Sequence, residues 1–253
     1  MRKRTIFAML AAATALGGLA APAAQADGYG DTTITNVTVD GGGKVAIGTT
    51  GAKTFKVAVT ASDDSGVKRA EFYLDGPSYG YLQPDAKVKC VASATDATTS
   101  TCTGTFTVDP AVDFVDNAPA GTWYVSAWID AKDGDYFTSG KAGSFAMQRL
   151  SKLTVDASPE PVKKGKTLTV TGALTRANWE TSAYAGYTNQ PAQLQFRKRD
   201  SDTYTTLKTV NTGSRGALKT TVTATEDGWY RWTFAGTSTT PPATAGGDFI
   251  DVQ

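Results

Sequence analysis

The sequence predicts an all-β fold in which two sandwich domains follow one another behind an export signal. After residue 26, nearly every segment is a run of roughly six to ten residues rich in Val, Thr, Phe, Tyr and Trp, bounded by Gly, Asp, Asn or Pro. No segment of useful length repeats its apolar residues with the period of a helix. The strand pattern also restarts after residue 147, which divides the chain into two units.

The first 26 residues have the form of an export signal. They comprise a basic start at 2–4, an apolar run at 6–21 and a small-x-small cleavage site at 24–26. The run is too short and too rich in Ala and Gly to anchor in a bilayer, and no later run reaches the roughly 18–20 residues of a membrane span. We therefore predict a secreted protein without a membrane span, beginning near Asp27.

Charge and composition exclude several functional classes. Residues 27–147 carry 15 acidic and 9 basic side chains, a net charge of −6, and residues 148–253 carry 9 acidic and 13 basic ones, a net charge of +4. This balance makes nucleic acid an unsuitable partner. The chain has no histidine, which removes Ser-His-Asp and Cys-His sites, the usual zinc sites and the commonest general base. We predict no enzymatic activity, with an enzyme of unfamiliar type as the alternative.

The first domain, residues 27–147, has the pattern of an immunoglobulin-like sandwich. Strands are predicted at 32–39, 44–48, 54–61, 67–74, 88–93, 102–108, 122–131 and 136–147. In the third of these, Phe55, Val57 and Val59 alternate with Lys56 and Ala58, which gives the strand one buried face. Seven or eight short strands in about 120 residues, separated by regular turn signals, are typical of this fold.

The second domain, residues 148–253, repeats the pattern. Its first strand is predicted at 153–157, before the kink at 159–161, whose two prolines cannot lie inside a central strand. Further strands are predicted at 167–175, 192–199, 204–211, 218–224, 230–235 and 249–252. Residues 148–151, between the two patterns, are too few to form a flexible tether, so we place the boundary there.

The two cysteines, Cys90 and Cys102, are predicted to form a disulfide. An even number of cysteines in an exported chain favours a bridge, here around 11 intervening residues. Closing such a loop would stabilise the fold by roughly 3 kcal/mol. A redox site would prefer a Cys-x-x-Cys spacing, which the chain lacks.

Five Asp residues of the first domain are candidate metal ligands. They lie in or beside the loops that join strand 54–61 to 67–74 and strand 122–131 to 136–147, and such loops leave an immunoglobulin-like sandwich at the same end. They are Asp63, Asp64, Asp130, Asp133 and Asp135. With loop carbonyls they would supply the oxygen ligands that Ca²⁺ prefers. Lys132 breaks the EF-hand pattern, and the alternative is that these residues serve ordinary Asp-Gly turns.

Aromatic residues on predicted loops are the second set of candidates. Flat rings on exposed loops can stack on sugar rings or on a protein partner, and the alternative is that they cover their own core or the domain junction. They are Tyr79, Tyr81, Trp179, Tyr184 and Tyr187. A site of this kind would make the protein an adhesion module for a cell-wall polysaccharide or an extracellular protein.

Several motifs resemble those of known proteins. Ala-Ser-Asp-Asp-Ser-Gly-Val at 61–67, Glu-Phe-Tyr-Leu at 71–74 and Ala-Gly-Thr-Trp-Tyr-Val at 120–125 resemble the bacterial Ig-like domains of secreted proteins. Residues 157–168 and 234–240 resemble the C-terminal domain of secreted actinobacterial tandem Ig-like proteins, some of which carry a calcium-binding label. The resemblance covers most of the mature chain, implies its fold and transfers no catalytic residue.

The sequence thus predicts a secreted, non-enzymatic protein of two tandem immunoglobulin-like sandwiches that acts by binding. Calcium at the Asp-rich loops is the leading hypothesis for its function. The rivals are a carbohydrate or cell-wall adhesion module using the aromatic loops and a purely structural envelope protein.

Overall fold

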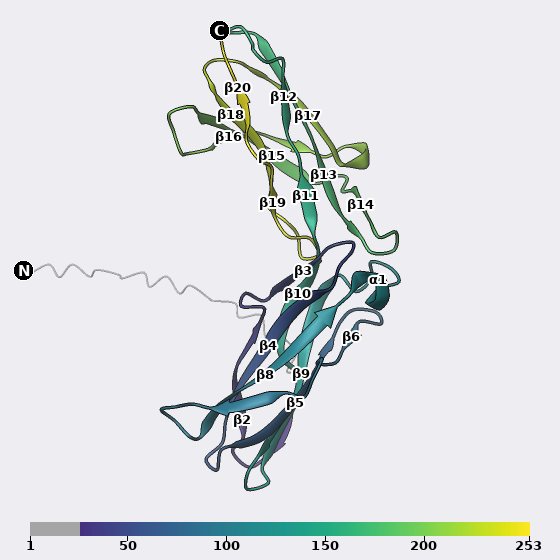
Figure 1. Ribbon diagram of the computed structural model, residues 1–253, viewed down its shortest axis with the longest axis vertical. Helices are drawn as coiled ribbons and strands as arrows, with labels where there is room; N and C mark the ends of the chain where they lie inside the picture. The colour runs from purple at the N-terminus through teal and green to yellow at the C-terminus, as the bar shows by residue number, and fades with distance from the viewer. Residues whose placement is uncertain (1–25) are drawn as a thin grey trace, which may run out of the picture.

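The chain forms two β-sandwiches placed end to end, with four sheets in all (Figure 1). The structure, a computed structural model, describes residues 26–253, so the export signal predicted at 1–26 lies outside the described residues except for Ala26. The predicted all-β fold of two sandwiches is confirmed. No helix in the described part of the chain is long and apolar enough to cross a membrane.

The first sandwich packs a four-stranded sheet on a six-stranded one. Its strands are β1 (Ala26–Tyr29), β2 (Thr33–Val39), β3 (Lys44–Ile47), β4 (Lys53–Ser62), β5 (Val67–Asp75), β6 (Tyr81–Leu82), β7 (Lys89–Ala92), β8 (Thr99–Val108), β9 (Gly121–Ala131) and β10 (Tyr136–Arg149). One sheet has the order β2-β4-β8-β7, and the other β1-β10-β9-β5-β6 with β3 parallel to β10. The runs β2-β4-β8-β7 and β10-β9-β5 follow the ABED and GFC orders of immunoglobulin-like domains.

Alternating residues of these strands fill the first core. Phe55 and Val57 of β4 are buried, as the alternation predicts, and they face Phe72 of β5 and Trp123 of β9 from the opposite sheet. The Trp123 Nε1 donates to the carbonyl oxygen of Pro119 at 2.7 Å, so the indole is satisfied inside the core. A Cβ at Gly76 would lie 2.2 Å from the Trp123 ring, which is why only glycine fits there.

The second sandwich is built around one long strand. Its strands are β11 (Ser151–Leu153), β12 (Asp156–Ser158), β13 (Thr167–Asn178), β14 (Ala183–Gly186), β15 (Pro191–Lys198), β16 (Thr205–Asn211), β17 (Ala217–Thr223), β18 (Gly228–Phe234), β19 (Ala243–Thr244) and β20 (Asp248–Ile250). Strands β11, β12, β14 and β17 all pair with β13, while β16, β15 and β18 form the facing sheet with β19 and β20. The strand predicted at 153–157 is divided between β11 and β12.

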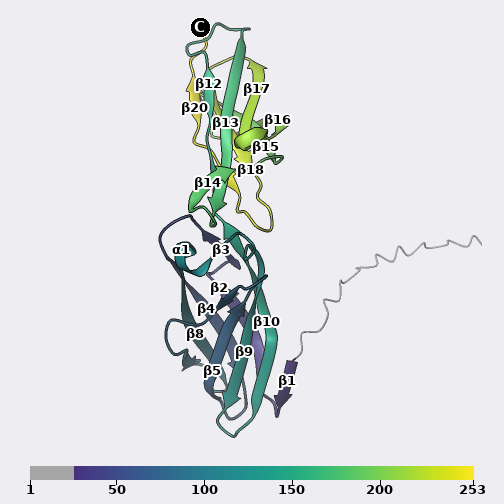
Figure 2. The ribbon, with the colours of Figure 1, turned by 90° about the vertical axis from the view of Figure 1, so that its right-hand side faces the viewer.

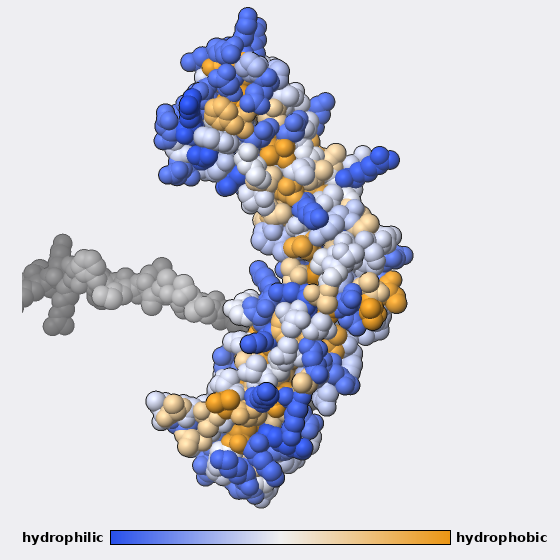
Figure 3. Space-filling model, viewed as in Figure 1, coloured by the Kyte–Doolittle hydropathy of each residue, from blue (hydrophilic) through white to orange (hydrophobic). Residues whose placement is uncertain are grey.

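Several short elements were not predicted from the sequence. They are β1, β6, β14 and β19, the helix α1 (Pro110–Asp113) and a 3-10 turn η1 (Ser214–Gly216). Asp109 begins α1 by accepting a hydrogen bond from the Ala111 N–H at 3.0 Å. Val112 and Val115 are 76% and 75% exposed, and Figure 3 shows an apolar patch at the place of α1.

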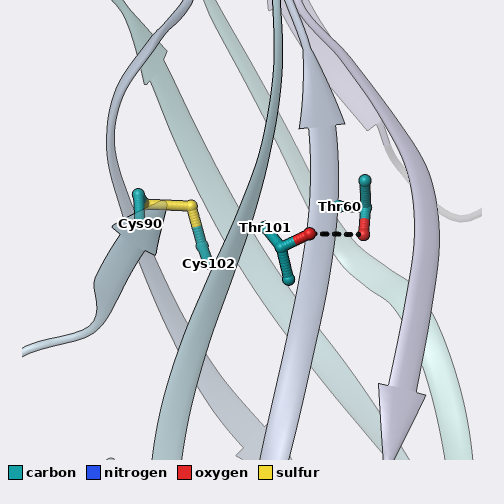
Figure 4. Close-up of a disulfide and its surroundings, with 4 residues drawn as sticks. All are labelled: Thr60, Cys90, Thr101 and Cys102. Carbon is teal, nitrogen blue, oxygen red and sulfur yellow. Dashed lines mark hydrogen bonds between the residues drawn. A yellow bond between two sulfur atoms is a disulfide. The ribbon is translucent and has the colours of Figure 1, made fainter. Parts of the chain in front are cut away.

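The predicted disulfide is confirmed, because Cys90 of β7 and Cys102 of β8 lie directly opposite each other and are bonded (Figure 4). On the neighbouring pair of strands, the side chains of Thr60 and Thr101 are hydrogen-bonded at 3.4 Å. Cys102 is fully buried, so the bridge ties the edge strand β7 to the sheet beside the core.

The two sandwiches meet at a packed junction, formed by the end of β13 and the nearby loops of the first domain. Trp179 follows β13 but is 2% exposed and belongs to the first core, where its ring stacks on Phe114 with centroids 4.4 Å apart. Its Nε1 donates to the carbonyl oxygen of Gly48 at 3.0 Å. Asn117 and Asn178 add a side-chain hydrogen bond of 2.7 Å across the junction. A side chain from the second domain thus completes the core of the first.

Two arginines also hold the junction. The Arg149 N–H donates to the Thr239 carbonyl at 2.9 Å, and its Nε donates to the Ala177 carbonyl at 2.6 Å. Arg176 donates to the Thr240 hydroxyl at 3.1 Å. Burial, together with the positive charge of Arg176, lowers the pKa of Arg149 to about 10. The chain between the two sandwiches is therefore fixed by hydrogen bonds.

Candidate metal centre at the end of the first domain

Three loops bring carboxylates together at the end of the first sandwich away from the junction (Figure 1). One loop joins β1 to β2, one joins β4 to β5 and one joins β9 to β10. In two groups of three, one oxygen of each carboxylate lies within 4.8 Å of the others. The groups are Asp31, Asp63 and Asp64, and Asp63, Asp133 and Asp135. We refer to these five residues as the acidic pole, and Asp63 belongs to both groups.

Of the metal ligands predicted from the sequence, the structure brings together Asp63, Asp64, Asp133 and Asp135 and leaves out Asp130. Asp130 is still within β9, where the alternation of side chains sends it to the outer face of the sheet. There its carboxylate accepts hydrogen bonds from Arg69 and, at 2.6 Å, from the Trp128 Nε1. Burial opposes ionisation of Asp130, but these partners outweigh it and lower its pKa.

Asp31 is the member that sequence reasoning missed. It follows β1, a short strand that pairs with the beginning of β10 and places Tyr29 beside Tyr136 (Figure 2). Four residues are too few for an alternating strand pattern to appear, so the sequence does not predict β1 or the turn that follows it. The Gly30-Asp31 pair before a strand was the available signal, since Gly and Asp mark turns.

Asp63 is a buried anion at the centre of the acidic pole. It is 2% exposed, and its Oδ1 accepts hydrogen bonds from the Ser65 N–H at 2.9 Å and the Ser65 hydroxyl at 2.6 Å. The Thr32 hydroxyl donates to its Oδ2 at 2.6 Å. Burial would raise the pKa of Asp63, but these hydrogen bonds outweigh it and hold the pKa below its ordinary value. A carboxylate has about four lone-pair sites, so one remains available after three hydrogen bonds.

The remaining carboxylates crowd around Asp63. Desolvation and the negative charges of Asp64 and Asp63 raise the pKa of Asp31. The Asp31 N–H donates to Asp135 Oδ2 at 3.1 Å, and the Asp135 N–H donates to Asp133 Oδ1 at 3.0 Å. The first of these hydrogen bonds joins the β1–β2 loop to the β9–β10 loop, and the second lies within the β9–β10 loop.

No basic side chain in the described part of the chain forms an ion pair with the acidic pole. The ion pairs that exist involve Asp40, Glu71, Asp130, Glu226 and Asp227. Two oxygens bound to one Ca²⁺ at about 2.3–2.6 Å are at most about 5 Å apart, and both groups satisfy this limit with atoms within 4.8 Å. Hard, anionic oxygen ligands at this spacing fit calcium.

Three of the five aromatic candidates belong to the junction or its surroundings. Trp179 is buried there, so its ring is covered by Phe114. The ring of Tyr184 carries the Lys152 ammonium group at 3.8 Å, and the ring of Tyr187 carries the Arg176 guanidinium at 3.8 Å. These contacts occupy ring faces that would otherwise stack on a ligand.

The other two candidates lie on the first sandwich. The Tyr79 hydroxyl accepts hydrogen bonds from the backbone N–H groups of Val115 and Asp116 at 3.0 and 3.2 Å, so this residue holds the segment after α1. Tyr81 is 50% exposed and stacks on Tyr73 with ring centroids 6.0 Å apart. Of the five candidates, Tyr81 has the most open ring.

Comparison with known proteins concerns the fold. No family model and no curated protein matches the chain. Among solved structures, the chain is similar to the three N-terminal domains of the bacteriophage RB49 highly immunogenic outer capsid protein, with 11% identity over 88% of this chain and 70% of that one and a TM-score of 0.34. It is also similar to the D00-D0 domain of intimin, with 12% identity over 85% of this chain and 99% of that one and a TM-score of 0.28. The ectodomain of mouse nectin-like molecule 4 gives 14% identity over 87% and 63% of the two chains and a TM-score of 0.26.

By its own strand order, the chain is a pair of tandem immunoglobulin-like sandwiches. At these low identities and TM-scores, no residue role is taken from the similar structures. The disulfide is consistent with an extracellular location.

Proposed function

We propose that this is a secreted, non-enzymatic binding protein whose first domain binds Ca²⁺ at the acidic pole. The observation that carries the proposal is Asp63, which is buried, ionised and shared by two groups of carboxylates that form no ion pair with a basic side chain among residues 26–253. A buried charge is costly unless a counter-charge or several hydrogen bonds compensate it. Calcium would supply the counter-charge that Asp63 does not receive from an ion pair in the described part of the chain.

Calcium bound at either group would join two loops, and Asp63 is shared by both groups. Asp31, Asp63 and Asp64 would hold the β1–β2 and β4–β5 loops, and Asp133 and Asp135 would add the β9–β10 loop. Without the ion, repulsion among the carboxylates should loosen these loops. Extracellular calcium modules typically have dissociation constants of about 10⁻⁴–10⁻³ M, so such a site would be filled outside the cell and empty inside it.

The test is thermal unfolding of the mature protein in calcium and in EDTA. At a calcium concentration about 100 times the dissociation constant, the native state gains about 2.7 kcal/mol. The double variant Asp63→Asn, Asp133→Asn should lose the calcium-dependent rise in Tm. Asp130→Asn is the matched control, and it should keep the rise because Asp130 lies outside both groups. If the wild type shows no rise, or the control loses it, the acidic pole does not bind calcium.

Adhesion through the aromatic loops receives less support. Trp179 is buried, and Tyr184 and Tyr187 carry cations on their rings. Within the set proposed from the sequence, only Tyr79 and Tyr81 are more than 40% exposed. A binding surface made of exposed rings therefore has to lie elsewhere than on the loops of the second domain.

A further inference from the structure

The outer face of the six-stranded sheet of the first domain presents a set of aromatic rings. On β9, Trp123, Val125, Ala127 and Ile129 are buried, so the residues between them point outward. On β5, Ala70, Phe72 and Leu74 are buried, so Glu71 and Tyr73 between them point outward too. The outward rings are Tyr29 of β1, Tyr73 of β5, Tyr81 of β6, Tyr124 and Trp128 of β9, and Tyr136 of β10. We refer to these six residues as the aromatic face.

Strand pairing and stacking gather five of these rings into two clusters on the aromatic face. Tyr29 lies opposite Tyr136, and Tyr136 stacks on Trp128 with centroids 5.3 Å apart and planes 12° apart. Further along the sheet, Tyr73 stacks on Tyr81. Tyr29, Trp128 and Tyr81 remain 69%, 44% and 50% exposed. Three large rings on one side of one sheet are thus open to solvent, which marks an interaction surface.

The charged groups on this face largely compensate one another. Arg69 forms ion pairs with both Glu71 and Asp130, and the Asp130 carboxylate also accepts from Trp128 Nε1. Lys141 lies over the ring of Tyr124 at 4.6 Å. These four charged side chains cancel. Asp75 of β5 and Asp27 of β1, two positions before Tyr29, add carboxylates to the same face, and Lys68 lies near Asp130. The face therefore has no block of one charge that would attract a polyanion or a polycation.

We infer that the aromatic face binds an uncharged polysaccharide. The flat apolar side of a sugar ring stacks on Trp and Tyr rings, and its hydroxyl groups hydrogen-bond to charged side chains such as Glu71 and Arg69. Charge balance favours a neutral polymer over a charged one. The inference does not depend on calcium binding, because none of the six rings belongs to the acidic pole.

A second copy of the chain is a less suitable occupant. Packing two such faces together would bury the Arg69, Glu71 and Asp130 cluster away from water, and desolvation of buried ion pairs commonly costs more than their attraction returns. A sugar chain leaves part of the face hydrated and offers hydroxyl groups to the same side chains. The two occupants can be distinguished by the oligomeric state of the protein, because only a second copy of the chain would make it a dimer.

The test is retention of the mature protein on microcrystalline cellulose and on chitin, measured in EDTA and again in calcium. We expect retention on at least one of them in EDTA, with Trp128→Ala and Tyr81→Ala each weakening the apparent affinity by about tenfold or more. Leu207→Ala is the matched control, since Leu207 is 43% exposed but lies on β16 of the second domain. It should bind as the wild type does.

Four results would overturn the inference. They are no retention on either polymer, retention that both ring variants keep, release of the bound protein by heparin at constant ionic strength, and a dimer in sedimentation that Trp128→Ala dissociates. Because two variants on different strands are used, misfolding of one leaves the other to decide. If the wild-type protein shows no calcium-dependent rise in Tm, only the proposed metal centre is refuted. The polysaccharide inference stands apart from it, because retention is measured in EDTA.

Discussion

Replacing Trp179 with alanine should destabilise the first domain, although the residue follows β13 of the second. The indole is 2% exposed, stacks on Phe114 and donates to the Gly48 carbonyl at 3.0 Å. In Trp179→Ala both contacts disappear, and Phe114 loses the ring that covers it. A substitution in the second domain is therefore predicted to destabilise the first domain.

The magnitude follows from the burial of the ring. A buried Trp removes about 150–250 Å² from water, which at about 25 cal/mol per Å² corresponds to an upper limit of about 4–6 kcal/mol. Truncations of buried Trp or Phe in protein cores cost about 3–5 kcal/mol. We expect Trp179→Ala to lose about 3–5 kcal/mol, or roughly 6–20 °C in Tm for a chain of this size.

Urea unfolding and native-state hydrogen exchange measure this effect. Protection of the backbone N–H groups in β4 and β9 should fall in Trp179→Ala, since both strands line the first core. Trp128→Ala is the matched control, because Trp128 is 44% exposed and should cost only about 1 kcal/mol through its stacking on Tyr136. Equal losses in the two variants, or faster exchange confined to the second domain, would refute the reasoning.

Three further predictions concern the first domain. Replacing Cys90 and Cys102 together with serine should lower the free energy of unfolding by about 3 kcal/mol, measured by urea titration against the oxidised wild type. Gly76→Ala should lower Tm because a Cβ would meet the buried indole behind it at 2.2 Å; an unchanged Tm would contradict the packing. Since the pKa of Asp31 is raised, the free energy of unfolding of the calcium-free protein should fall as the pH rises through that pKa. Calcium affinity should weaken as the pH falls, because Asp31 becomes protonated. Calcium titrations at several pH values should show that Asp31→Asn flattens the pH dependence of the affinity. The lowered pKa of Asp63 acts in the opposite sense, with its stability present above the ordinary value near 3.8 and lost below it.

The strands that line the cores could be predicted from the sequence because their apolar residues alternate. The alternation of Phe55, Val57 and Val59 marks β4, and the same pattern marks β9. Strands such as β1 and β6 could not be predicted in this way. They contain four and two residues, too few for a period to appear, and pairing with longer neighbours holds them in place.

The same reasoning explains which site residues could be predicted. Asp63, Asp64, Asp133 and Asp135 lie in loops between strongly patterned strands, so the end of the sandwich they occupy follows from strand order. Asp130 lies at the end of a strand, as predicted, but outside both groups, because a residue still within a strand points according to the pleat rather than into the loop. The outward positions of β9 also carry a signal in the sequence, since Trp128 lies out of phase with the buried residues.

Strand β10 connects the three features of the first domain. It begins at Tyr136, one residue after Asp135 of the acidic pole, and Tyr136 itself belongs to the aromatic face. It ends at Arg149, whose N–H and Nε hold the junction. The pairing of β10 with β9 shifts register between Ser139 and Gly143, and on both sides of this irregularity β10 is held in the sheet. The pole, the face and the junction therefore keep a fixed order along one strand. A ligand bound at the aromatic face would therefore lie beside the metal centre, while the packed junction holds the second domain at the opposite end.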